Sequence, residues 1–173
     1  MSETEREKLN RERLDRLAAM RRITDPPTVV PIRWIYPEEV GTIVVQCLRD
    51  AGFAATSSSD GRGFTANAGS ESQVPALNLA WYRCSALYPT DPRASLTVWN
   101  QAQREVAYEY LTESLIPCLR GLGAEPAQAP SRAVYLSDPD RWEYPDAGSQ
   151  AARELWAREC PLDPPTAIML GEE

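Results

Sequence analysis

The sequence predicts an α+β fold, in which four or more helices pack on a small antiparallel sheet and two disulfides cross-link the chain. Three observations lead to this prediction. Apolar residues recur at helical spacing in several segments that proline or glycine bounds. Runs rich in β-branched residues are short and too few for a β-sandwich. Finally, the 173-residue chain has four cysteines, each near the end of a predicted helix.

The first predicted element is an exposed helix at residues 2–22. Acidic residues stand near its start and two arginines, Arg21 and Arg22, near its end, as the helix dipole favours. Its apolar stripe is thin and consists of Leu9, Leu14, Leu17 and Met20. We predict that residues 1–23 form an exposed N-terminal helical arm. It either lies loosely on the domain or binds a protein partner or neighbouring subunit. Residues 24–173 then form a single domain cross-linked by the disulfides.

Three segments are predicted to build the sheet. Residues 28–35 alternate apolar and polar side chains, and Pro31 suggests an edge strand. Residues 53–68 read as a hairpin, with Asp60-Gly61 as a two-residue turn that forces antiparallel pairing. A third strand is expected at residues 133–136.

Four further helices are predicted from apolar spacing and from their end signals. The first begins at Pro37 and ends at Gly52. The second covers residues 75–87. The third, residues 97–122, is long, and Pro117 should kink its last turn. The fourth, residues 147–160, is stopped by Pro161. The stripe expected on the long helix consists of Trp99, Val106, Tyr110 and Leu115.

One hexapeptide pattern, Cys-Leu-Arg-x-x-Gly, occurs at residues 47–52 and again at residues 118–123, 71 residues apart. Each copy is predicted to be the last turn of a helix. Cysteine and leucine would face inward, arginine would face the negative helix end, and glycine would make the turn. The pattern indicates either a weak internal duplication or convergence on a favourable helix end. No catalytic mechanism needs this spacing.

Composition narrows the function classes. The net charge of −7 argues against nucleic acid or an anionic membrane surface as the main partner. The chain has no histidine, which removes the Ser-His-Asp triad, the Cys-His dyad and most catalytic zinc sites. No run of 18 apolar residues exists, and the amino terminus lacks the apolar core of a secretory signal as written. We expect no enzyme activity, no cofactor and no metal.

The spacing of the cysteines favours two structural disulfides over four buried free thiols. There is no Cys-x-x-Cys pair, which disfavours a zinc ribbon or a thioredoxin-type motif. Disulfides would mean an oxidising, extracytoplasmic compartment, either the cell envelope or a virion. Helices 75–87 and 97–122 should pack antiparallel, which separates Cys84 from Cys118 by about 30 Å along the long helix. Cys47–Cys84 with Cys118–Cys160 is therefore favoured, and Cys47–Cys118 with Cys84–Cys160 stays open.

The densest candidate site is residues 137–146, SDPDRWEYPD. Tryptophan and tyrosine could present amphipathic rings to a ligand there, beside charged groups. The stretch could also be a turn-rich surface loop. The possible binding patch comprises Asp138, Asp140, Arg141, Trp142 and Tyr144.

Two other kinds of site can be drawn from the acidic residues. Calcium could be held by oxygen ligands of residues 138–146, although that stretch lacks the glycine and spacing of an EF-hand loop. Carboxylate pairs for glycoside hydrolysis could come from Glu109, Glu113, Asp138 and Glu143.

Several stretches over residues 23–165 resemble a family of actinobacterial secreted proteins and predicted lipoproteins. They are ITDPPTVVPIRWIYPEE, CLRDAGF, WYRCSALYPTDP, IPCLRGLGAEPAQAPS and CPLDPP. The resemblance implies an envelope location and no established enzymatic activity. The chain departs from the family pattern, because it lacks a signal peptide with a lipobox cysteine.

These observations lead us to expect a non-catalytic extracytoplasmic binding or structural module. One alternative is a structural or host-interaction protein of an actinobacteriophage virion, whose first helix would contact neighbouring subunits. The other alternative is a hydrolase that uses carboxylates.

Overall fold

The computed structural model describes residues 1–95 and 99–172. These residues form helices and one two-stranded antiparallel sheet, and two disulfides cross-link them. The α+β class is therefore confirmed. The chain divides into two compact units, Met1–Ser95 and Leu96–Glu173, each with one disulfide.

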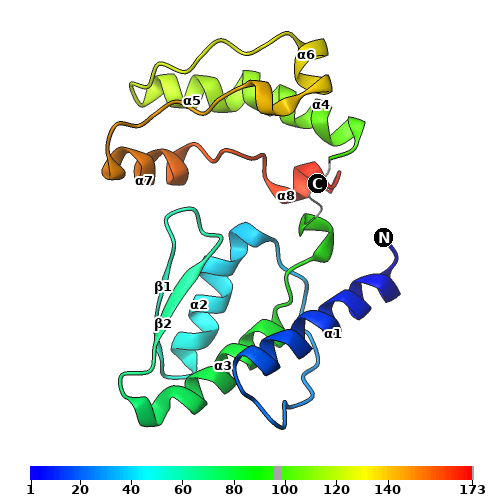
Figure 1. The fold of residues 1–173 in the computed structure, drawn as a ribbon, viewed down its shortest axis with the longest axis vertical. Coiled ribbons are helices and arrows are strands. Elements are labelled where there is room, and N and C mark those ends of the chain that lie inside the picture. The colour runs from blue at the N-terminus through cyan, green and yellow to red at the C-terminus, as the bar shows by residue number, and fades with distance from the viewer. Residues whose placement is uncertain (96–98, 173) are drawn as a thin grey trace. The chain divides into compact units, whose positions relative to one another are not determined.

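The first unit combines three longer helices with the hairpin (Figure 1). The hairpin lies along α2, and its strands pair from Ala54↔Asn67 to Ser57↔Phe64. Between hairpin, α2 and α3 lies a core centred on Leu48, which is fully buried. The elements are α1 (Glu3–Met20), α2 (Val40–Asp50), β1 (Ala54–Ser57), β2 (Phe64–Asn67) and α3 (Val74–Leu87).

The second half of helix α1 packs on α3. Ala18 is buried against Tyr82 and Ala86 of α3. Arg13 donates a hydrogen bond of 2.8 Å to the carbonyl oxygen of Ser85. At the other end of α1, Arg6 pairs with Asp91 at 2.8 Å. Although most of its residues are exposed, α1 belongs to the packing of the first unit.

The hairpin is confirmed, but its predicted two-residue turn is wrong. The last paired residues are Ser57 and Phe64, so residues 58–63 form the connection. Within this loop the Ser58 hydroxyl accepts a hydrogen bond from the Gly63 amide, at 2.8 Å. Gly61 then accepts a 2.7 Å bond from the Gly41 amide, which ties the loop to the first turn of α2.

The predicted strands at residues 28–35 and 133–136 are also wrong. Residues 28–35 are not part of the sheet: Pro31 has no amide donor, and only Ile35 forms a bridge, parallel to Thr90. Residues 133–136 lie in helix α6 (Arg132–Ser137). There Tyr135 is buried against Tyr108, with ring centroids 5.4 Å apart, so packing overrides the β-propensity of a short segment.

The second unit is all helical over its described residues. Helix α6 lies beside α4, and α7 faces α5 across the second disulfide (Figure 1). Its core contains Leu115, Leu119, Trp156 and Cys160. The elements are α4 (Gln101–Tyr110), a π-helical turn (Leu111–Leu115), α5 (Ile116–Gly121), α6, α7 (Gln150–Glu159) and α8 (Thr166–Met169).

The long predicted helix is interrupted by the π-helical turn, just before Pro117. The wider turn accommodates the proline, which lacks an amide donor and would clash with the preceding turn. It also changes the helical phase, so the predicted stripe is only partly right: Leu115 is buried, whereas Val106 and Tyr110 are half-buried. Residues 97 and 98 of this prediction lie outside the described residues. The fully packed face consists of Ala107, Leu111, Leu115, Ile116 and Leu119.

Both copies of the hexapeptide end a helix in the same way, as predicted. Gly52 and Gly123 have φ of 89° and 81°, in the left-handed region. The next amide donates to the carbonyl of the leucine in each copy, Phe53 to Leu48 and Ala124 to Leu119, both at 3.0 Å. This is the Schellman helix end. The arginine of the first copy departs from the prediction, because Arg49 donates to the carbonyl of Ala55 on β1.

The favoured disulfide pairing is confirmed, and the repeat-to-repeat pairing is wrong. Cys47 of α2 is bonded to Cys84 of α3, and Cys118 of α5 to Cys160 at the end of α7. The Cα atoms are 5.8 Å apart in both. Two disulfides indicate an oxidising, extracytoplasmic environment. None of the described helices has both the length and the apolar character needed to cross a membrane.

We expect the two helix ends to respond to substitution through backbone conformation alone. A Cβ atom at Gly52 or Gly123 would meet nothing within 4 Å, but an L-residue is strained at these φ values. G52A and G123A should each lower the free energy of unfolding by about 1 kcal/mol in urea titrations. Gly121 is the control: it is equally uncrowded but helical, so G121A should raise stability by up to about 1 kcal/mol. A loss at Gly121 equal to that at Gly52 would contradict this explanation.

The buried carboxylate of Asp91 should make stability depend on pH. Burial raises the pKa of Asp91, but hydrogen bonds from Arg93 and the charges of Arg6 and Arg93 outweigh burial, so the pKa lies below its usual 3.8. A lowered pKa stabilises the folded state at pH values above the pKa that Asp91 has in the unfolded state. This stabilisation is lost as pH falls through the pKa of the folded state.

D91N should therefore lower the free energy of unfolding by about 3 kcal/mol at pH 7. As pH falls below about 4, the stability of D91N should decrease less steeply than that of the natural chain. Urea titrations over pH 2–7 measure both effects. D15N, at an exposed position of α1, should change stability by less than about 0.5 kcal/mol. Parallel pH profiles for D91N and the natural chain would refute the role of Asp91.

Candidate functional site

A pocket of about 170 Å³ in the second unit gathers aromatic and acidic side chains from distant segments. Ala107, Leu111 and Leu115 form its buried part. We call it the acidic aromatic pocket. Around the helix residues it is defined by Trp99, Tyr135, Asp140, Trp142, Leu162 and Asp163.

Local structure restrains three of these residues, Trp142, Tyr135 and Asp163. Trp142 follows a short 3₁₀ turn (Pro139–Arg141), and its indole N–H donates to the carbonyl of Ala127 at 3.1 Å. Tyr135 projects from α6 and packs on Tyr108 of α4. Asp163 lies between Pro161 and Pro164, in the segment that follows α7. The pocket is therefore built on restrained backbone.

The electrostatics of the pocket are dominated by its two carboxylates. Burial raises the pKa of Tyr135, and the negative charges of Asp163 and Asp140 raise it further. The phenol therefore stays protonated at neutral pH and can donate a hydrogen bond. Asp140 itself is exposed, whereas Asp163 is half-buried. The arrangement combines negative charge with aromatic faces, which favours cations over anions.

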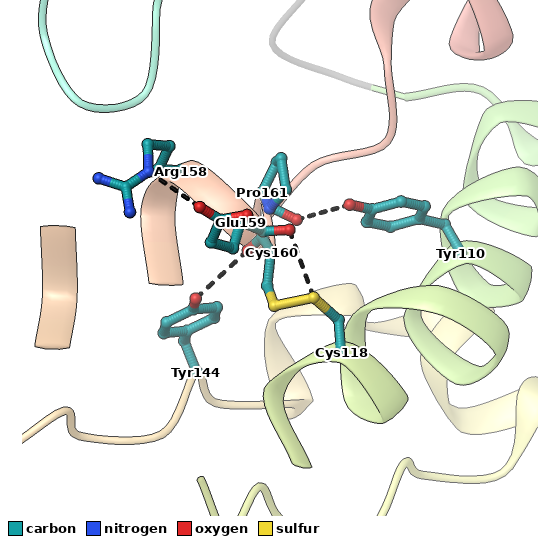
Figure 2. The surroundings of a disulfide bond; sticks show 7 residues. All are labelled: Tyr110, Cys118, Tyr144, Arg158, Glu159, Cys160 and Pro161. Carbon is teal, nitrogen blue, oxygen red and sulfur yellow. Dashed lines mark hydrogen bonds and ion pairs between the residues drawn. A yellow bond between two sulfur atoms is a disulfide. The ribbon is translucent and has the colours of Figure 1, made fainter. Parts of the chain in front are cut away.

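The second disulfide lies next to the segment that carries Asp163 (Figure 2). Two phenol rings approach the end of α7 from different sides. Tyr110 donates to the carbonyl of Pro161 at 2.7 Å, and Tyr144 donates to that of Cys160 at 3.4 Å. The disulfide sulfur of Cys118 lies 3.3 Å from the carbonyl oxygen of Glu159. Carbonyls at the helix end thus have partners, and the chain leaves α7 in a defined direction.

Burial also raises the pKa values of both phenols around this disulfide. For Tyr110 the charge of Asp163 adds to the effect. Both groups therefore remain protonated donors over the physiological pH range. The contact of Tyr144 with Trp142 and Trp156, at centroid distances of 6.2 and 6.1 Å, links the disulfide to the wall of the pocket.

The structure distributes the predicted binding patch over three environments. Asp140 and Trp142 line the pocket together. Asp138 and Arg141 form an exposed ion pair of 3.4 Å. Tyr144 packs beside the disulfide. A role of these residues in ligand binding stays a prediction.

Sequence reasoning missed the other members of the pocket, Trp99, Tyr135 and Asp163. One signal could have pointed to Asp163: the motif Pro-x-Asp-Pro follows the second cysteine of each disulfide, at residues 89–92 and 161–164. The two aromatic residues come from segments far apart in sequence, and no local pattern marks them.

The acidic residues considered for glycoside hydrolysis lie elsewhere. Glu109, Glu113, Asp138 and Glu143 do not line the pocket, and Glu109 lies 3.8 Å from Arg132. Among residues 1–95 and 99–172, no three side chains of the His, Cys, Asp and Glu types lie together as a metal site would need.

Comparison with known proteins found no matching family model, no similar curated protein and no similar solved structure. The function must therefore be argued from the pocket itself.

Proposed function

We propose that the protein is a non-catalytic binding module of the cell envelope or of a virion, and that the acidic aromatic pocket holds part of its ligand. The observation that carries this proposal is the convergence of three aromatic rings and two carboxylates in one cavity. Aromatic side chains offer large contact area at low entropic cost, and a few polar groups around them give specificity.

The rigidity of the frame supports a binding role. Disulfide Cys118–Cys160, the proline-flanked Asp163 and the hydrogen-bonded Trp142 hold the pocket in shape without a ligand. A preformed site loses little conformational entropy when its ligand enters. The resemblance to actinobacterial secreted proteins and the oxidised cysteines both favour a location outside the cytoplasm.

The titration behaviour of the pocket favours binding over acid–base catalysis. A general base works best with a pKa near the working pH, and histidine, the commonest such group, does not occur in the chain. Burial raises the pKa of Tyr135, which moves it further from neutrality.

A second contact surface belongs to this proposal. The outer face of α1 exposes Leu9 to 40% and Met20 to 74%, which a partner or neighbouring subunit could cover. Light scattering of the full chain tests this part: a dimer that L9K/M20K dissociates would support it, and a monomer at high concentration would contradict it.

Fragment screening by NMR tests the pocket without assuming a ligand. A mixed set of cationic, neutral and anionic fragments is added to ¹⁵N-labelled full-length protein, whose five tryptophans give separate indole signals. Some fragments should shift the signals of Trp99 and Trp142. Trp34 and Trp81, in the first unit, should not move and are the internal controls. If no fragment of any class shifts Trp99 or Trp142, the proposed function is wrong.

A further inference from the structure

We infer that the acidic aromatic pocket binds the guanidinium group of an arginine side chain that a partner protein presents. The inference rests on the proposed binding function and names its ligand. The observation behind it lies in the first unit, which uses an equivalent frame to hold an arginine of its own.

The two units share the frame that carries the acidic motif. Each has a helix that ends in Cys-Leu-Arg-x-x-Gly, cross-linked to a second helix with the same end geometry. The second helix ends at Tyr88 in the first unit and at Cys160 in the second. Their backbone angles are nearly the same, with φ and ψ of −126° and 70° at Tyr88 and of −129° and 71° at Cys160. The motif Pro-x-Asp-Pro follows each of these two residues directly, so its two copies are 72 residues apart. The position of the disulfide cysteine differs: Cys84 stands one helical turn before Tyr88, whereas Cys160 is itself the residue at the helix end.

In the first unit the aspartate of this motif, Asp91, binds Arg6 of α1. The distance from the guanidinium nitrogen to the carboxylate oxygen is 2.8 Å. The guanidinium carbon lies 4.6 Å from the ring centroid of Trp34. A carboxylate and an aromatic face thus hold one arginine, and Arg93 completes the charge balance around the buried Asp91.

In the second unit Asp163 occupies the corresponding position of the motif, and it lies in the acidic aromatic pocket. The pocket offers the same two kinds of contact in larger number: Trp99, Tyr135 and Trp142 supply aromatic faces, and Asp140 adds a second carboxylate. The negative net charge of the chain also favours a basic partner. The frame is therefore repeated with the chemistry of an arginine site.

The size and shape of the pocket select among cations. Its volume of 170 Å³ is below the roughly 300–1,000 Å³ of sites that enclose whole small molecules, so it suits one side chain of a larger partner. A planar guanidinium stacks on aromatic rings and pairs with carboxylates in a bidentate way. A lysine ammonium is more strongly hydrated and loses more on leaving water.

Blocked amino acids test the inference on the full chain. N-acetyl-arginine, N-acetyl-lysine and N-acetyl-citrulline N-methylamides are titrated while the indole signal of Trp142 is followed. Arginine should bind at least about tenfold more tightly than uncharged citrulline, with lysine between them. Equal affinities for arginine and citrulline would overturn the inference. Free arginine should bind no better than the blocked form, and a clear preference for free arginine would point to a metabolite and overturn the assignment to a partner protein.

Charge-neutralising variants locate the site. D140N and D163N should each weaken arginine binding by about threefold or more. E143Q removes the same charge at an exposed position beside Trp142 but outside the pocket lining, so it should change affinity less than about twofold. Because Asp140 is exposed, D140N should fold, and it decides the question if D163N does not. Unchanged affinity in D140N would refute the inference. Fragments that bind the pocket with no preference for guanidinium would refute the inference alone and leave the proposed binding function standing.

Discussion

A disulfide between the last turn of one helix and the last turn of a later helix is the constraint on which each unit depends. Units of this size have small hydrophobic cores, so a covalent cross-link contributes a substantial share of their stability. Here the wholly buried side chains near each disulfide are few, with Leu48 in one unit and Leu119 in the other at their centres. The two disulfides join cysteines 37 and 42 residues apart. A cross-link over such a separation contributes about 2–4 kcal/mol to stability, largely by restricting the unfolded chain. The Schellman end places cysteine and leucine of each hexapeptide in the same turn, so covalent and apolar contacts reinforce each other.

The chain direction after each disulfide follows from the same constraint. Tyr88 and Cys160 leave their helices with nearly identical backbone angles, and the prolines that follow keep both segments extended. An aspartate two residues beyond the proline is thereby held at a set position relative to its disulfide. In the second unit Tyr110 and Tyr144 add hydrogen bonds to the carbonyls of this segment (Figure 2). The candidate site is thus an extension of the cross-linked frame.

Local signals explain what the sequence could predict. Proline and glycine mark helix ends at Pro37, Gly52 and Gly123 regardless of packing. The disulfide pairing was predicted correctly, but the antiparallel helix pair from which it was argued is not shown, because α3 belongs to the first unit and α4 and α5 to the second. The strand predicted at residues 133–136 was wrong because four residues of β-propensity cannot outweigh the burial of Tyr135 in a helix. The site was predictable only where it is local: Asp140 and Trp142 stand in one stretch. Trp99 joins them through tertiary structure, which no pattern within its segment encodes, and only the repeated Pro-x-Asp-Pro motif marks Asp163.

The two copies of the acidic motif differ in burial, and this difference explains why the first copy needs arginines of the chain around its carboxylate. Asp91 is 1% exposed, and an unpaired carboxylate at such a position would cost several kcal/mol, so folding requires the arginines that surround it. Arg6 belongs to α1, so its ion pair with Asp91 makes that helix part of the unit. Asp163 is half-buried and Asp140 exposed, so water can hydrate part of each carboxylate. The same partial exposure limits what a bound cation gains from charge alone. Stacking on Trp99 and Trp142 must therefore supply part of the affinity, which is why a planar guanidinium suits this pocket better than an ammonium.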